Sequence, residues 1–498
     1  MVRGIGSRRG RVCRLGSALL LLITASCWDG PPSLSYPNPE TYTVGVAISS
    51  LDPTVTGTIS KYSVSPSLPA GLSINAATGV ISGTPTSVTA GSLYTVTATY
   101  ASGSTSFSIS IQVVAPAGPP SNVESIVLDG GPSALTIPVV NTAFVSIKIC
   151  APGSSTNCQT IDHVKVDTGS VGLRIIAGAA IGSGGGELTA LTLPAAVDAS
   201  GNPLAECVHF ADGWSWGSIA TADITLPVSG ESASGVNIQV ISATSAGDPS
   251  AASPSCVPAV LTTKNTVTSF GANGTLGVGL FLNDCLTTST CEPGGSATYY
   301  SCPKGGVCTQ TATSSVAQLV PNPVSKFPKD NNGVILELPA VSDSGAANPS
   351  GGQLIFGIGT ESNNGLGSAT QLPADPTSGH ITALLNGSTL IDSYFDSGSN
   401  GIFFPSSLPV CTPNNGFYCP TAATAENAIL GSSNVAADFD IANAASLFTN
   451  TSLTAFNNLG GPNPDLQSLD LGLPFFFGKK IYIGFANPST GATPYFAY

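Results

Sequence analysis

One four-residue pattern occurs twice in this chain, and it limits the possible folds more than any other feature of the sequence. The two copies are Asp167-Thr168-Gly169-Ser170 and Asp396-Ser397-Gly398-Ser399. Each copy follows an apolar run and precedes a glycine-containing apolar run, which predicts a strand, a tight turn and a second strand. Residue frequencies predict about 0.1 chance matches to this pattern, so composition alone does not explain two copies in the same context.

The first 27 residues have the features of a secretory signal peptide. Five arginines precede an apolar run from Leu15 to Ile23, which is too short to span a bilayer as a stable helix. Thr24-Ala25-Ser26-Cys27 then follows. Cys27 after small residues resembles the cleavage site of a bacterial lipoprotein, so we expect either a lipid on Cys27 or ordinary cleavage nearby. Both alternatives export the chain to the bacterial cell envelope, in the periplasm or on the cell surface.

Charge limits the partners of the exported chain. Removal of residues 1–27 takes away five of the 15 basic residues and no acidic residue, which leaves 10 basic against 28 acidic residues, a net charge of 10 − 28 = −18. Such a surface repels nucleic acid and anionic lipid. We therefore expect no nucleic-acid partner, contact with a membrane only through a lipid on Cys27, and a monomer.

Ten cysteines follow Cys27, an even number that favours disulfides in an exported chain. Their spacing predicts local bridges Cys150–Cys158 and Cys411–Cys419, and we expect a disulfide to close the loop from Cys285 to Cys308. The remaining pairings stay open. The three histidines, His163, His209 and His380, lie far from any Cys-x-x-Cys pair, so we expect no metal site and no cofactor.

Composition along the chain predicts an all-β protein of two parts. Residues 31–114 alternate apolar and polar residues between turn residues, which predicts a small β-sandwich. Leu68–Ile74 and Thr78–Pro85 resemble segments of the immunoglobulin-like modules of bacterial surface proteins, and we interpret this part as a spacer. Residues 115–123 form a Pro-rich linker.

The remaining residues, 124–498, have short apolar runs bounded by Gly, Pro, Asn and Ser, with almost no helical periodicity. Thr424–Leu430 and Ala442–Phe448 are the best short helix candidates. This length allows two β lobes with separate cores.

Four further motifs accompany the tetrads. After the first tetrad come His209–Gly217, which precedes a strand at 224–226, and then Gly274–Leu280. Gly351–Gly357 and Leu469–Phe476 lie before and after the second tetrad. In this order, the tetrads and these motifs resemble the catalytic loops, flap hairpin and hydrophobic-Gly strands of the pepsin-like, two-lobed aspartic proteases. The resemblance covers residues 124–498 and implies a bilobal β domain, with an N-terminal lobe at 124–330 and a C-terminal lobe at 331–498.

The resemblance also implies roles for the tetrads. Asp167 and Asp396 would share one proton and activate water between them, as an aspartic endopeptidase does. The other tetrad residues would support the catalytic loops: Gly169 and Gly398 by allowing tight turns, Thr168 and Ser397 by bracing one loop against the other, and Ser170 and Ser399 by donating to the outer carboxylate oxygens. The substrate would be an extended peptide or protein under the hairpin.

The chain departs from the family at the hairpin. Phe210 stands where the family has a flap tyrosine, next to Asp212 and Gly213. Trp214 or Trp216 is then our candidate for covering the substrate, through an indole N–H. Because Phe210 has no hydroxyl, a catalytically inactive surface or periplasmic protein that binds peptide or glycan stays open as an alternative, as does a purely structural envelope protein.

Two polar residues resemble site residues but are interpreted otherwise. Asp343 begins a third Asp-Ser-Gly, but Ala346-Ala347-Asn348-Pro349 follows in place of an apolar strand, which predicts a loop. His163 precedes the first tetrad by four residues. A pair of carboxyl groups that shares a proton needs no imidazole, so we interpret His163 as a strand or surface residue.

Overall fold

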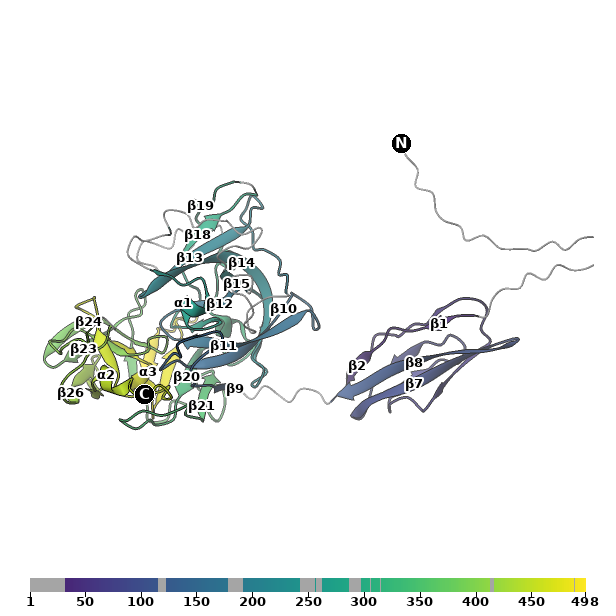
Figure 1. Ribbon diagram of the computed structural model, residues 1–498. Helices are drawn as coiled ribbons and strands as arrows, with labels where there is room; N and C mark the ends of the chain where they lie inside the picture. The colour runs from purple at the N-terminus through teal and green to yellow at the C-terminus, as the bar shows by residue number, and fades with distance from the viewer. Residues whose placement is uncertain are drawn as a thin grey trace, which may run out of the picture. The chain divides into compact units, whose positions relative to one another are not determined.

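The computed structural model describes residues 32–114, 122–177, 191–241, 256, 262–285, 297–304, 306–313, 315–412, 416–487 and 489–498. These residues belong to two compact units, Met1–Gly118 and Pro119–Tyr498 (Figure 1). The predicted signal segment with Cys27, and residues 115–121 of the predicted linker, lie outside the described residues.

The first unit is a small β structure. Its four-stranded sheet has the order β2 (Glu40–Thr43), β8 (Gly103–Val114), β7 (Thr89–Tyr100) and β4 (Lys61–Ser65). Two strand pairs accompany it: β1 (Leu34–Ser35) with β3 (Thr54–Val55), and β5 (Leu72–Ile74) with β6 (Ile81–Gly83). Alternate residues of β7 and β8, such as Val96, Ala98, Ile109 and Ile111, are fully buried, as expected for sheets with one face in a core.

The first half of the second unit is built on a ten-stranded sheet. Its strands, in spatial order, are β10 (Phe144–Cys150), β11 (Cys158–Asp167), β17 (Gly274–Val278), β12 (Val171–Ile176), β15 (Ser232–Ile241), β14 (Gly213–Thr225), β13 (Leu204–Phe210), β18 (Ala297–Ser301) and β19 (Thr309–Gln310). Strand β16 (Thr262–Thr263) pairs with β14, and helix α1 (Val267–Phe270) follows β16. Two 3-10 helices, Val316–Gln318 and Pro323–Lys326, follow β19.

The second half contains a seven-stranded sheet in the order β28 (Val435–Ala436), β27 (Ala428–Leu430), β23 (Ile381–Leu385), β24 (Ser388–Asp396), β31 (Asp470–Gly472), β25 (Ile402–Phe404) and β30 (Gly460–Pro462). Strands β26 (Thr424–Glu426) and β29 (Phe439–Ile441) form a separate pair, and helices α2 (Ala444–Leu447) and α3 (Leu473–Phe476) lie in this half. In Figure 1, β23, β24 and β26 lie well away from β13, β14 and β18.

A six-stranded sheet connects the two halves. Its order is β22 (Gln371–Pro373), β33 (Tyr495–Ala497), β32 (Lys480–Gly484), β20 (Gly333–Glu337), β21 (Gly352–Phe356) and β9 (Val123–Ile126). Strand β9 begins the second unit yet pairs with β21 of the other half. Among the described residues, strands hold far more of the chain than helices, and each helix has only three or four residues, so the predicted all-β fold class is confirmed.

The two halves repeat one arrangement of three strands. In the first half, β17 lies between β11, to which it is parallel, and β12, to which it is antiparallel. In the second half, β31 lies in the same way between β24 and β25. The tetrads connect β11 to β12 and β24 to β25, so each tetrad forms the turn at the same place in its half.

Three sequence expectations are corrected. The largest hydrophobic cluster runs through both halves, from Ile126 to Phe496, so the halves do not have separate cores. Residues 424–430 form β26 and β27, whose buried and exposed residues alternate with period two, a strand pattern. Cys308 pairs with Cys302, so no disulfide joins Cys308 to Cys285.

The two local disulfides predicted from spacing, Cys150–Cys158 and Cys411–Cys419, are confirmed. A longer bridge joins Cys207 to Cys256, which lie 49 positions apart in the sequence. Cys285 is also disulfide-bonded. Helix α2 lies within the second helix candidate, Ala442–Phe448. Among the described residues, no helix has the length and apolar character needed to cross a membrane.

Candidate functional site

The two tetrads meet at the junction of the halves, and each carboxyl group packs over the glycine of the other tetrad. A Cβ atom built on Gly169 would lie 2.6 Å from the Asp396 Cγ, and one on Gly398 would lie 2.6 Å from the Asp167 Oδ1. Only glycine permits an approach this close. The carboxyl groups of Asp167 and Asp396 therefore face each other within hydrogen-bonding reach.

Thr168 and Ser397 tie the two turns together across the junction. The Thr168 hydroxyl donates to the Phe395 carbonyl (3.0 Å) and accepts from the Ser397 N–H (2.9 Å). The Ser397 hydroxyl donates to the Val166 carbonyl (2.8 Å) and accepts from the Thr168 N–H (3.1 Å). Both residues are buried, where unpaired hydrogen-bonding groups are costly, so these four bonds hold the turns in one relative position.

Each carboxyl group is also held by its own tetrad. Asp167 Oδ1 accepts from the Gly169 N–H (2.9 Å), and Oδ2 accepts from the Ser170 hydroxyl (2.6 Å). Asp396 has the equivalent bonds, from the Gly398 N–H (2.8 Å) to Oδ1 and from the Ser399 hydroxyl (2.8 Å) to Oδ2. These bonds fix the orientation of both carboxyl groups.

Burial and the second carboxyl group change the acidity of the pair. Desolvation raises the pKa of Asp396 to about 7, the neighbouring Asp167 carboxyl adds to this shift, and the Ser399 hydroxyl opposes it. Asp167 is 5% exposed, whereas Asp396 keeps partial contact with solvent. The raised pKa allows Asp396 to keep its proton up to about pH 7 beside the Asp167 carboxyl group.

A cation that the sequence reasoning missed lies next to the pair. Lys165 is two residues before Asp167 on β11, so both side chains project from the same face of the strand. Its Nζ donates to the Gly398 carbonyl (3.4 Å) and lies 5.4 Å from the centre of the Phe270 ring. Phe270 packs edge-on against Phe210, with ring centroids 5.7 Å apart. These contacts connect the β13–β14 hairpin to the second tetrad.

Strands β13 and β14 form the hairpin expected around Phe210, and its tip is held from one side. Phe210 pairs with Gly213, and Gly213 also pairs with Thr262 of β16. The Asp212 carboxylate accepts an ion-pair hydrogen bond from Lys264 Nζ (2.5 Å). A Cβ on Gly213 would lie 2.6 Å from Lys264 side-chain atoms and the Thr262 carbonyl, so this contact requires glycine.

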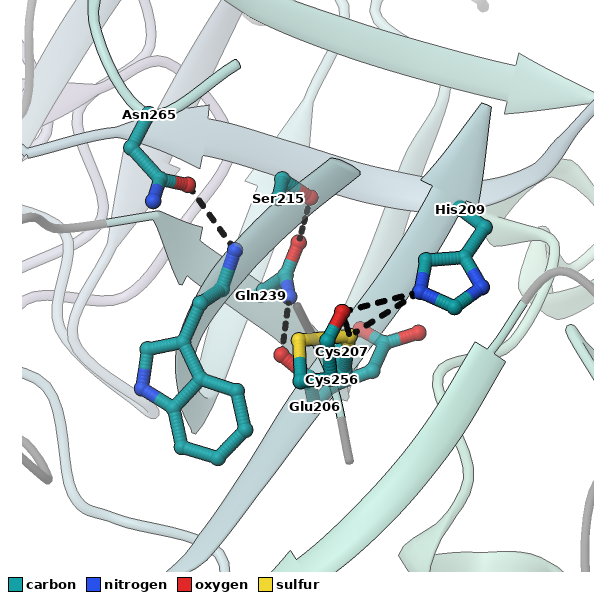
Figure 2. The surroundings of a disulfide bond; sticks show 8 residues. Glu206, Cys207, His209, Ser215, Gln239, Cys256 and Asn265 are labelled. Carbon is teal, nitrogen blue, oxygen red and sulfur yellow. Dashed lines mark hydrogen bonds between the residues drawn. A yellow bond between two sulfur atoms is a disulfide. The ribbon is translucent and has the colours of Figure 1, made fainter. Parts of the chain in front are cut away.

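The body of the hairpin is fixed by a disulfide and by buried polar bonds, which Figure 2 shows. Cys207 of β13 is bonded to Cys256, and His209 Nε2 lies 3.0 Å from the Cys256 carbonyl oxygen. Nearby, Gln239 donates to the Glu206 carbonyl (2.8 Å) and accepts from the Ser215 hydroxyl (3.3 Å). The hairpin is therefore anchored in the first half of the unit.

The expectation that Trp214 or Trp216 covers a substrate is wrong. Trp214 and Trp216 are 8% and 2% exposed. Trp216 packs edge-on against Tyr300 of β18, with ring centroids 4.9 Å apart, and its backbone N–H donates to the side-chain oxygen Oδ1 of Asn265 (2.9 Å). Because β18 pairs with β13 and covers this part of the hairpin, both indoles belong to the core.

His163 and Asp343 do not belong to the carboxyl pair. His163 lies in β11 with its ring between Asp129 (3.2 Å) and Asp162 (3.3 Å). Asp343 lies in a turn, where its carboxylate accepts from the Asn457 side chain (3.1 Å). Cys207, His209 and Cys256 place three potential metal ligands within 4.8 Å, but both sulfur atoms are in the disulfide and are not thiolates that could bind a metal.

A third carboxyl group lies beside the pair and was not singled out from the sequence. Asp470 of β31 is 4% exposed, and its Oδ1 has no hydrogen-bond partner among the described residues. In the parallel register, β31 places Asp470 opposite Tyr394 and Gly472 opposite Asp396. The only sequence signal was a charged residue inside an otherwise apolar strand motif.

Comparisons with known proteins match each of the two parts of the chain to a protein family. Residues 29–114 match a family model described as "Putative Ig domain", which confirms the immunoglobulin-like module. A search of curated protein sequences found no match. Residues 118–498 match the family model described as "Protein of unknown function (DUF3443)". This second match covers more than half of the chain and includes both tetrads, so the protein belongs to the DUF3443 family.

Proposed function

We propose that this protein is an exported aspartic endopeptidase in which Asp167 and Asp396 activate a water molecule for attack on a peptide carbonyl. The observation that carries the proposal is the facing pair of carboxyl groups, each packed over the glycine of the opposite tetrad. Two carboxyl groups this close share one proton, which supplies a base and an acid in the same place.

In the proposed reaction, the ionised carboxylate takes a proton from water while the protonated carboxyl donates to the substrate carbonyl oxygen. The new C–O bond gives a tetrahedral intermediate. Its C–N bond then breaks as the amine nitrogen takes a proton from the pair. No covalent bond to the protein forms. The bonds of Thr168 and Ser397 keep the two carboxyl groups in place, so little reorganisation is needed during the reaction.

The proposed substrate is an extended peptide that reaches the partly exposed Asp396 beside the hairpin tip. We further propose that Cys27 carries a lipid, so that the immunoglobulin-like module separates the second unit from a membrane. The disulfides among the described residues support export, because such bonds persist in oxidising compartments.

The test uses the mature chain, residues 28–498, with an unfolded protein as substrate at pH 4–5. We expect cleavage that a statine-type transition-state mimic stops. Asp167→Asn and Asp396→Asn should each lower kcat by about 10²–10⁴-fold, the usual contribution of general acid–base catalysis. Asp343→Asn is the matched control, since this Asp-Ser-Gly lies in an unrelated turn. Cleavage that survives both site variants and the inhibitor would refute the proposal.

A binding protein without turnover is the second candidate, and the hairpin tip favours it. Phe210 offers no hydroxyl, and its ring packs against Phe270. On this alternative, calorimetry would detect binding of a peptide or glycan by the mature chain, no product would form, and Asp167→Asn with Asp396→Asn would leave the affinity unchanged.

A further inference from the structure

Because the three-strand arrangement is repeated, Asp470 can be compared with the residue at the equivalent position in the first half. In the first half, β17 places Thr275 opposite Lys165 and Gly277 opposite Asp167. In the second half, β31 places Asp470 opposite Tyr394 and Gly472 opposite Asp396. Thr275 and Asp470 therefore occupy equivalent positions. Thr275 is neutral, and its hydroxyl donates to the Lys165 carbonyl (3.3 Å), whereas the second half has a carboxyl group here.

The Asp470 side chain is directed toward the pair. Paired residues of parallel strands project from the same face of a sheet, so Asp470 and Asp396 share a face. Asp470 is almost fully buried, and one of its oxygens has no hydrogen-bond partner in the part of the chain that the structure describes. The Ser399 hydroxyl acts on the Asp470 carboxyl group, and a bond donated by Ser399 would lower the pKa of Asp470. Ser399 thus lies between Asp470 and Asp396.

A single hydroxyl cannot donate to both carboxyl groups. The Ser399 hydroxyl has one proton, and it donates to Asp396 Oδ2 at 2.8 Å. Toward Asp470, the Ser399 oxygen can therefore act only as an acceptor. Asp470 must then be the donor, which requires a proton on its carboxyl group.

The negative charges near Asp470 also favour the protonated form of its carboxyl group. Burial raises the pKa of Asp470 well above its usual range, and the Asp396 and Asp167 carboxyl groups add to this shift. Tyr394 faces Asp470 across the strand pair, and burial raises the pKa of its phenol. The Lys165 cation acts on Asp396 and lowers its pKa. A neutral Asp470 avoids placing a third negative charge beside two carboxyl groups.

We propose that Asp470 is a positioning residue that stays protonated, donates to Ser399 and thereby strengthens the bond from Ser399 to the Asp396 carboxylate. Donation to a hydroxyl makes that hydroxyl a better donor. The protonation of Asp470 is independent of turnover, whereas its effect on turnover rests on the proposed peptidase function.

The first experiment measures protonation without using activity. In the unfolded chain, Asp470 ionises above about pH 4, but in the folded chain it keeps its proton. Folding therefore binds one more proton, and the unfolding equilibrium constant gains a factor of about ten per pH unit from this group. Urea titrations of the mature chain between pH 4.5 and 6.5 should show this dependence reduced by one proton in Asp470→Asn. Asp440→Asn, at an exposed acid of β29, should match the wild type.

The second experiment measures the pH dependence of peptide cleavage. Asn at position 470 keeps a neutral donor for Ser399, so Asp470→Asn should retain the wild-type pH profile. Asp470→Ala removes the donor, so the pKa of the pair should rise and kcat should fall by about three- to tenfold with KM unchanged. Asp470→Thr copies the first half and provides a second variant with a neutral donor if the Asn variant does not fold.

The unfolding experiment tests the protonation of Asp470, and the cleavage experiment tests its effect on turnover. Unfolding curves with the same pH dependence in the wild type and the folded 470 variants would overturn the proposal, whatever the activity. A cleavage profile that Asp470→Asn moves to lower pH would also overturn it, because the wild-type residue would then be ionised. If the wild type cleaves nothing, the peptidase proposal fails, and the unfolding experiment still decides whether Asp470 is protonated.

Discussion

At the scale of single residues, the short contacts between the tetrads explain why these residue types are present. Gly169 and Gly398 leave room for the opposite carboxyl groups, and Thr168 and Ser397 supply hydroxyls where the two turns cross. The sequence predicted these four residues because the pattern itself specifies small and hydroxyl side chains. Lys165 and Asp470 were missed, because their importance depends on contacts with residues more than 60 positions away.

Removal of one bracing hydroxyl should weaken the junction. Thr168→Val keeps the shape of the side chain but leaves the Ser397 N–H and the Phe395 carbonyl, both buried, without their partner. We expect the free energy of unfolding to fall by about 1–3 kcal/mol, measured by urea titration. Thr160→Val, at an exposed position of the same strand, should change it little. An equal effect of the two substitutions would show that the cross-junction bonds are not stabilising.

At the scale of elements, the repeated strand–turn–strand unit was predictable, but the surroundings of the hairpin were not. Apolar runs and turn residues are local signals, and they indicated β11, β12, β24 and β25. The burial of Trp214 and Trp216 arises from β18, more than 80 residues later, and from Cys256. Spacing revealed the two eight-residue disulfide loops but gave no signal for the Cys207–Cys256 bridge.

The Cys207–Cys256 bridge should stabilise the hairpin. Cys207→Ser with Cys256→Ser should lower the free energy of unfolding by about 2–4 kcal/mol, because the bridge restricts the unfolded chain. Thermal unfolding of the mature chain measures this change. Replacement of Cys150 and Cys158 by Ser, at a bridge that spans only eight residues, is the matched control and should cost less. A larger loss in the control would contradict this account of the hairpin.

At the scale of the whole molecule, several buried acids have a raised pKa. Besides Asp396 and Asp470, burial raises the pKa of Glu231 to about 7, with a contribution from neighbouring Asp330. It also raises the pKa of Glu124, which joins β9 to the turn before β15. Each of these groups binds its proton more tightly in the folded chain than in the unfolded chain. At a pH between the unfolded and folded pKa values of these groups, the folded second unit therefore binds more protons than the unfolded chain does.

These raised pKa values make the second unit less stable as the pH rises. A raised pKa in the folded state contributes stability that is present below the unfolded pKa, about 4, and is lost as pH rises through the folded pKa, here about 7 for Asp396 and Glu231. We expect the second unit to unfold at a lower temperature at pH 8 than at pH 5. Calorimetry of the mature chain checks this, and a higher unfolding temperature at pH 8 would contradict the assigned shifts.

The pH profile of kcat/KM for cleavage of one defined peptide tests the central claim most directly. With a pair that shares one proton and an Asp396 pKa of about 7, kcat/KM should fall as pH rises through about 7, because the second carboxyl group then loses its proton. Asp396→Asn should remove cleavage at every pH while the variant stays folded. Cleavage by Asp396→Asn with the wild-type profile would show that the carboxyl pair is not the catalytic centre.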